Sequence, residues 1–207
     1  MSTEQSTGQP ATSAPPRRFA ILIVVALVAL ALDVVSKAVV VANLEGKAPV
    51  TVLPGLLYFD VSRNPGAAFS MATGMTWVFS LVALAVAVAI GWVAPRLRSV
   101  GWAIGLGLVL AGALGNLMDR IFRAPGPLRG HVVDFISVFR PEGGAFAIFN
   151  LADSSITVGA VVIVLMALLN KDYDGGIART ARLANESAIA NESATTNDTA
   201  TTSESAE

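Results

Sequence analysis

Long apolar stretches, separated by shorter polar segments, dominate the chain between residues 19 and 170. An α-helix needs about 20 mostly apolar residues to cross the hydrocarbon core of a bilayer. Four stretches approach or exceed this length, at residues 19–42, 75–93, 100–118 and 154–169. The pattern therefore predicts an α-helical integral membrane protein with four transmembrane helices.

The first apolar stretch carries an acid and a base, Asp33 and Lys37, in its second half. A cleavable signal peptide has a shorter apolar region, so we interpret residues 19–42 as a retained helix. The two residues are four positions apart and share a helix face. Two interpretations stay open: an ion pair whose lysine extends to the membrane surface, or a direct role in a site. A Ser36–Lys37 dyad is disfavoured, because adjacent helical residues point about 100° apart.

The connection between the first two spans is too apolar for a free loop. Its sequence APVTVLPGLLYFDVSRNPGAAFSM contains short extended segments, interrupted by Pro54-Gly55 and Pro65-Gly66. We therefore expect a small β-like segment on the outer membrane surface. The polar tails, residues 1–18 and 171–207, are predicted to be disordered, which leaves residues 19–170 as the membrane domain.

Basic residues in the short connections indicate the orientation in the membrane. Four spans place both chain ends on one side, and five basic residues fall there: Arg17, Arg18, Arg96, Arg98 and Lys171. We therefore expect both termini to be cytoplasmic. The connection from 119 to 153 carries four more: Arg120, Arg123, Arg129 and Arg140. Acidic residues accompany these four, so we expect them to be site or interface residues.

The composition narrows the possible chemistry. Charged residues make up 14% of the chain, well below the roughly 25% of soluble domains. There is no cysteine and one histidine, His131, which excludes disulfides, thiolate nucleophiles and a multi-histidine metal site. The net charge of −1 gives no indication of nucleic-acid binding. We expect no metal and no cofactor.

Polar residues at span edges are functional candidates, because an unpaired ionisable group in a membrane costs several kcal/mol. The segment GALGNLMDR closes the third span, and its glycines at 112 and 115 allow close helix approach. Asn116, Asp119 and Arg120 follow at spacings of three and four and share one face. Helix packing explains the glycines but not these polar residues. Asn64, in RNPGAAFS, by itself indicates only a turn.

Two aspartates, Asp134 in HVVDFIS and Asp153 in FNLADSS, stand 19 residues apart in the sequence. Only a fold in which the connection returns to the start of the fourth helix can bring them together. Two close, partly desolvated carboxylates do not both ionise easily, so one keeps a proton while the other acts as base. Such a pair can activate water against an amide carbonyl. The alternative is two separate helix-capping acids at the membrane surface.

Five motifs in this order resemble those of the lipoprotein signal peptidase family, signal peptidase II. They are LDVVSK (32–37), NPGAAFS (64–70), GALGNLMDR (112–120), HVVDFI (131–136) and FNLADSSITVG (149–159). The departures are small: Val34 replaces a frequent glutamine, and GALGN replaces a common GGAxGN. The resemblance implies an aspartic endopeptidase of the bacterial cytoplasmic membrane, with its active site near the extracytoplasmic surface. It would cleave prolipoproteins on the amino side of a diacylglyceryl-modified cysteine.

The resemblance also implies site residues and partners. The catalytic dyad maps onto Asp134 and Asp153. The substrate-binding and supporting positions map onto Asp33, Lys37, Asn64, Gly66, Asn116, Asp119, Arg120, Asn150 and Ala152. The expected partners are diacylglyceryl-modified prolipoproteins and membrane lipid, without nucleic acid, and the enzyme is expected to act as a monomer.

Two rival functions belong to other classes. A small transporter would relay protons through Asp33, Lys37 and Asp119, and would require acids at mid-depth of several helices. Most acids here fall at one membrane edge, which favours surface chemistry. A non-catalytic scaffold would tolerate substitution of both Asp134 and Asp153.

Overall fold

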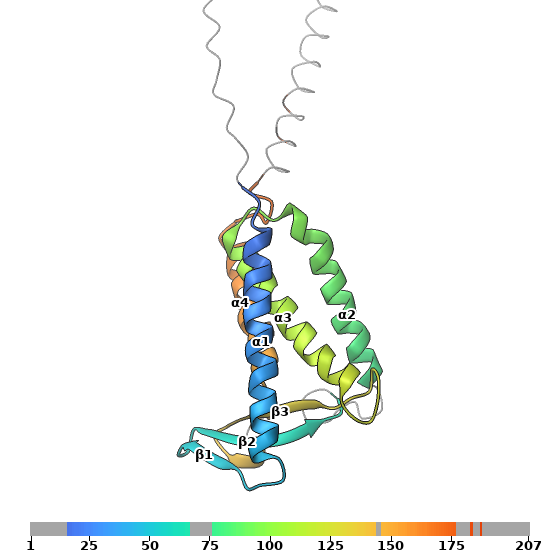
Figure 1. Cartoon of the computed structure of the whole chain (residues 1–207). Coiled ribbons are helices and arrows are strands. Elements are labelled where there is room, and N and C mark those ends of the chain that lie inside the picture. The colour runs from blue at the N-terminus through green and yellow to red at the C-terminus, as the bar shows by residue number, and fades with distance from the viewer. Residues whose placement is uncertain (1–15, 67–75, 144–145, 177–182, 184–186, 188–207) are drawn as a thin grey trace, which may run out of the picture.

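The computed structural model describes residues 16–66, 76–143, 146–176, 183 and 187 (Figure 1). The tails that the sequence predicts to be disordered fall almost entirely outside these residues. The same holds for Met75, the predicted first residue of the second span, and for the end of the NPGAAFS motif.

Four helices are long and apolar enough to cross a membrane, as predicted. They are α1 (Phe19–Leu44), α2 (Thr76–Val93), α3 (Val100–Phe122) and α4 (Leu151–Leu168). Short 3₁₀ turns, η2 (Ala94–Arg96) and η3 (Pro141–Gly143), lie in the connections. The two largest differences from the predicted boundaries are that α3 continues four residues further and that α4 begins three residues earlier. As a result Asp119 and Arg120 belong to α3, and Asp153 lies in the first turn of α4.

Large apolar side chains cover the outward faces of the helices. In a water-soluble protein contiguous apolar patches of this extent are rare, whereas lipid accepts them. The exposed side chains include Val24, Leu27, Val28, Val35 and Val39 on α1, Trp92 on α2, and Val161, Val164 and Leu168 on α4. The four helices therefore form a membrane-embedded bundle.

A three-stranded antiparallel sheet covers one end of the bundle, opposite the end where the described chain begins and α4 ends (Figure 1). Its strands are β1 (Val50–Leu53), β2 (Leu57–Asn64) and β3 (Val132–Val138), in the order β1-β2-β3. The first two confirm the predicted β-like segment. The third was not predicted, and it comes from the connection between α3 and α4.

Packing against α1 fixes the sheet to the bundle. Val40 of α1 forms a buried cluster with Val133 and Phe135 of β3. The Phe59 ring of β2 meets the Phe135 ring edge-on, with ring centres 5.9 Å apart. The sheet therefore has a defined position relative to the helix ends beneath it.

Glycines on α3 let this helix approach its neighbours closely. A Cβ atom on Gly112 would overlap the carbonyl oxygen of Ala152 and lie 2.5 Å from the side chain of Ile156 on α4. A Cβ atom on Gly115 would overlap the carboxylate of Asp33 on α1. The predicted role of these two glycines in close helix packing is confirmed.

Candidate active site

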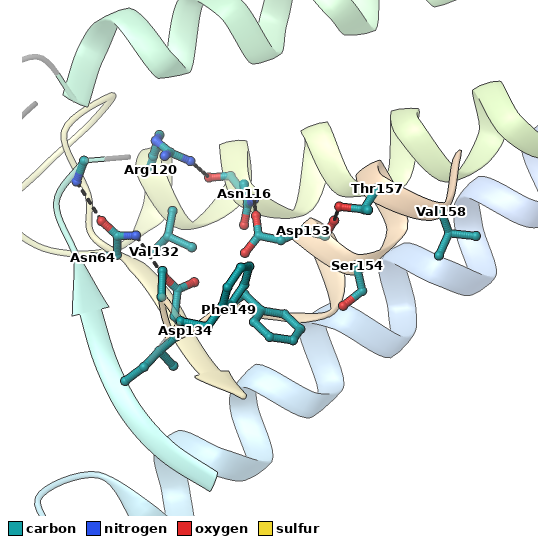
Figure 2. A pocket seen from close by; sticks show the side chains of 14 residues that line it. Asn64, Asn116, Arg120, Val132, Asp134, Phe149, Asp153, Ser154, Thr157 and Val158 are labelled. Atoms are coloured by element: carbon teal, nitrogen blue, oxygen red, sulfur yellow. Dashed lines mark hydrogen bonds between the residues drawn. The ribbon is translucent and has the colours of Figure 1, made fainter. Parts of the chain in front are cut away.

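Strand β3 brings Asp134 and Asp153 to one place. The residue before the N-cap of α4, Phe149, pairs with Ile136 of β3 through two backbone hydrogen bonds, Ile136 N to Phe149 O (2.8 Å) and Phe149 N to Ile136 O (3.1 Å). The start of α4 is thereby docked beside the strand that carries Asp134. The two aspartates line the same cavity although 19 positions separate them in the sequence (Figure 2).

The Asn150 side chain connects the two aspartates. It is the N-cap of α4, and its Oδ1 accepts a hydrogen bond from the Asp153 backbone N–H (3.0 Å). In return, Asp153 Oδ2 accepts from the Asn150 backbone N–H (3.1 Å), which completes a capping box. The side-chain NH₂ group of Asn150, Nδ2, donates to Asp134 Oδ1 at 2.6 Å. One fully buried side chain therefore starts the helix and holds both acids.

Each of the four carboxylate oxygens accepts one hydrogen bond. Besides the two bonds from Asn150, Asn64 Nδ2 donates to Asp134 Oδ2 (2.8 Å) and Asn116 Nδ2 donates to Asp153 Oδ1 (2.7 Å). The side-chain oxygen of Asn64, Oδ1, accepts a hydrogen bond from the Gly66 backbone N–H (2.9 Å). The side-chain NH₂ group of Asn64 therefore faces the Asp134 carboxylate. Figure 2 shows Asn64 and Asn116 approaching the two acids from β2 and α3.

Burial changes the acidity of Asp134, which lies in the sheet. Loss of hydration raises the pKa of Asp134 from 3.8 to about 7, and the negative charge of Asp153 acts in the same direction. The hydrogen bonds from Asn64 and Asn150 oppose this rise without cancelling it. Asp134 is thus able to hold a proton near neutral pH, as expected for one member of a carboxylate pair.

The cavity beside the two acids has a volume of about 570 Å³ and a mostly apolar lining. Six predicted site residues line it: Asn64, Gly66, Asn116, Arg120, Asp134 and Asp153. Phe149, the first residue of the motif FNLADSSITVG, also lines the cavity. The sequence analysis did not single out the other seven lining residues: Val132, Phe146, Ala147, Ile148, Ser154, Thr157 and Val158. Helix periodicity offered a signal for three of these, because positions 154, 157 and 158 lie one, four and five residues after Asp153.

Arg120 lies at the cavity edge without contacting either acid. Its Nη1 donates to the Asn116 carbonyl oxygen (3.1 Å), and its guanidinium lies over the Phe79 ring, 5.8 Å from the ring centre. Its buried Nε has no hydrogen-bond partner among the described residues. Of the other three arginines in this connection, Arg123 pairs with Asp119. Arg129 and Arg140 are exposed and do not line the cavity, so for these two only the expected role at an interface stays a prediction.

Four predicted residues lie behind the cavity rather than in it: Asp33, Lys37, Asp119 and Ala152. Lys37 is 1% exposed and its ammonium lies 2.8 Å from Asp33 Oδ2, which confirms the ion pair. The interpretation that Lys37 extends to the membrane surface is wrong, because Asp119 Oδ2 on α3 (3.1 Å) holds the ammonium inside the bundle. Ser36 is not part of a dyad, since its hydroxyl donates to the Asp33 carbonyl oxygen.

No three His, Asp or Glu side chains within the described part of the chain lie close enough together to hold a metal ion. The site consists of two carboxylates, Asp134 buried and Asp153 half-buried, at a mostly apolar cavity. Together with the four spans, it defines a membrane-embedded protein with a carboxylate pair at this cavity.

Comparison with known proteins gives the family. Residues 25–169 match the family model described as Signal peptidase (SPase) II. The chain is 50% identical to the lipoprotein signal peptidase of Mycobacterium tuberculosis H37Rv over 175 residues, 84% of either chain. It is 48% identical to that of Rhodococcus jostii RHA1, over 83% of this chain and 87% of the relative. A solved bacterial membrane enzyme superimposes with a TM-score of 0.66 at 28% identity, covering 77% of this chain and 93% of that structure. The chain belongs to the signal peptidase II family and is a membrane peptidase.

Proposed function

We propose that this peptidase removes signal peptides from prolipoproteins with Asp134 and Asp153 as its catalytic dyad. The observation that carries the proposal is the shared cavity, in which one buried residue, Asn150, is hydrogen-bonded to both acids. Hydrolysis by a carboxylate pair needs one protonated and one ionised acid close together. The raised pKa of Asp134, about 7, favours Asp134 as the acid that carries the proton before reaction.

The reaction then proceeds through one water molecule. Asp153, half-buried in the first turn of α4, acts as the base and removes a proton from this water as the water oxygen attacks the scissile carbonyl carbon. Asp134 donates its proton to the leaving amide nitrogen as the carbon–nitrogen bond breaks. Asp153 then holds the proton and Asp134 the charge, so transfer of one proton between them restores the starting state.

The substrate is a prolipoprotein whose cysteine carries a diacylglyceryl group, and the cut falls on the amino side of that cysteine. The apolar wall of the cavity, which includes Phe146, Ile148 and Val158, suits such a lipid-modified segment. Asn64, Gly66 and Arg120 supply polar groups at the same cavity. The buried Nε of Arg120, which has no hydrogen-bond partner in the described part of the chain, is suited to a backbone carbonyl of the signal peptide.

The enzyme acts as a monomer in the bacterial cytoplasmic membrane, with both termini in the cytoplasm and the sheet outside. The segments before α1, between α2 and α3, and after α4 lie at the bundle end opposite the sheet (Figure 1), and the basic residues that they carry support this orientation. They are Arg17, Arg18, Arg96, Arg98 and Lys171. The transporter alternative has lost its support, since Asp33, Lys37 and Asp119 are paired with one another in a peptidase.

Purified protein in detergent or lipid nanodiscs tests the substrate directly. We expect it to cleave a diacylglyceryl-modified prolipoprotein, with mass spectrometry placing the new amino terminus at the modified cysteine. The matched control is the same prolipoprotein without the lipid, which we expect to remain intact. Equal cleavage of both substrates, or a cut at another bond, would contradict the proposed specificity.

A further inference from the structure

Lys37 lies in the interior of the bundle with its ammonium group close to three acceptors. It is 1% exposed, and its Nζ lies 2.8 Å from Asp33 Oδ2, 3.1 Å from Asp119 Oδ2 and 3.1 Å from Asn116 Oδ1. An ammonium group has three N–H donors and no acceptor. The two carboxylates form ion pairs with this ammonium, and its hydrogen bond goes to Asn116, the residue that contacts Asp153.

The amide group of Asn116 has one orientation that satisfies its neighbours. Its Oδ1 accepts from Lys37 Nζ and from Asn150 Nδ2 (3.2 Å), and its Nδ2 donates to Asp153 Oδ1 (2.7 Å). Exchanging the two ends would direct an NH₂ group at an ammonium and another NH₂ group. It would also direct a carbonyl oxygen at the Asp153 carboxylate, leaving that oxygen without its donor.

Two further hydrogen bonds connect the carboxylates around Lys37 to the backbone beside the dyad. Asp33 Oδ1 accepts from the backbone N–H of Ala152 (2.9 Å), the residue before Asp153. Asp119 Oδ2 accepts from the backbone N–H of Val133 (3.2 Å), the residue before Asp134. The two carboxylates bound to Lys37 therefore each contact the backbone next to one dyad aspartate.

We propose that Lys37 is a positioning residue for the reaction: by donating to Asn116 Oδ1, it fixes the Asn116 amide so that its NH₂ group donates to Asp153. The inference rests on the proposed role of the dyad. Asn150 Nδ2 also donates to Asn116 Oδ1, over 3.2 Å, but the bond from Lys37 is the charge-assisted one and therefore the stronger constraint on the Asn116 amide.

A double-mutant cycle on cleavage of the lipid-modified prolipoprotein tests the inference. We expect Lys37→Met to lower kcat by about 10- to 100-fold through loss of orientation, with KM changing less than twofold. If Lys37 acts through Asn116, the Asn116→Ala/Lys37→Met variant has the kcat of Asn116→Ala alone. A purely structural role would instead multiply the two losses, and that result would overturn the inference. Ser36→Ala, one position away, is the control and should keep the wild-type kcat.

A second background keeps the test valid where Lys37→Met alone prevents folding. In Asp33→Asn/Lys37→Met one charge of each sign is removed, while the Asn side chain can still accept from Ala152 and Asp119 keeps its partner Arg123. The same cycle with Asn116→Ala is then measured with Asp33→Asn as the reference protein. If the kcat losses from Lys37→Met and Asn116→Ala multiply in this background too, the inference is overturned. Inactive Asp134→Asn and Asp153→Asn variants in parallel confirm the dyad, so failure of the Lys37 role is distinguishable from failure of the proposed function.

Discussion

Asn150 Nδ2 lies 2.6 Å from Asp134 Oδ1, and through this hydrogen bond the N-cap of α4 contacts the carboxylate of β3. The same side chain accepts from the Asp153 backbone N–H. The start of a membrane helix and the position of two acids are therefore determined by one residue. The N-cap residue of α4 therefore has a second function, because β3 lies beside it.

Substituting Asn150 separates these two functions. Asn150→Ala removes the cap and the bond to Asp134, so we expect a loss of about 1 kcal/mol in unfolding free energy together with a strong loss of cleavage. Asn150→Ser keeps a side chain that caps helices well but cannot reach Asp134 with an NH₂ group. It should recover most of the thermal stability while its kcat stays about 100-fold below wild type. Recovery of activity with the cap would contradict the bridging role of Asn150.

The close contact of α3 with α4 predicts a steric effect at Gly112. In Gly112→Ala the new methyl group overlaps the Ala152 carbonyl oxygen, so α4 has to move away with Asp153. We expect a destabilisation of about 1–3 kcal/mol in thermal unfolding and a lower kcat. The matched control is Gly91→Ala on α2, where an added Cβ atom meets nothing within 4 Å. Equal effects of the two substitutions would show that α3 tolerates a wider separation from α4.

The raised pKa of Asp134 predicts how cleavage depends on pH. Its protonated form, which the mechanism needs, is present below pH 7 and is lost as the pH rises through about 7. Between pH 6 and pH 8 the protonated fraction falls roughly tenfold, and kcat/KM should fall with it. An aspartate with an ordinary pKa, about 4, would already be ionised throughout this range.

His131 provides the control for this pH profile, because histidine side chains commonly titrate near the same pH. It is the single histidine of the sequence and does not line the cavity that contains the two acids. We expect His131→Gln to keep the decline of kcat/KM between pH 6 and pH 8. A flat profile in this variant would assign the decline to His131 and not to Asp134.

The spans could be predicted from the sequence because lipid requires long apolar helices, and this requirement acts on each segment separately. Helix boundaries were less accurate at Asp119 and Asp153. Polar residues there weaken the hydropathy signal, although tertiary hydrogen bonds stabilise them within the helices. The third strand was missed, although VVDFISV is rich in β-branched and aromatic residues. Asp134 lies within this segment and weakens the strand signal, because aspartate is depleted in strands.

The arrangement of the site depends on long-range contacts that no local pattern specifies. The pairing of Phe149 with Ile136 brings Asp153 to Asp134, and it requires β3 to be in place. The interior position of Lys37 likewise depends on Asp119 and Asn116, about 80 residues further along the chain. Sequence motifs could indicate these residues as a group, but only the fold separates those that line the cavity from those behind it.

The most direct test of the account is cleavage of a diacylglyceryl-modified prolipoprotein by wild type, Asp134→Asn and Asp153→Asn. All three proteins should be purified in the same lipid and compared in thermal unfolding, so that activity refers to folded enzyme. We predict that wild type releases the signal peptide and that each substitution lowers kcat by ~10²–10⁴-fold or more. Cleavage at the wild-type rate by either folded variant would contradict the proposal that Asp134 and Asp153 form the catalytic pair.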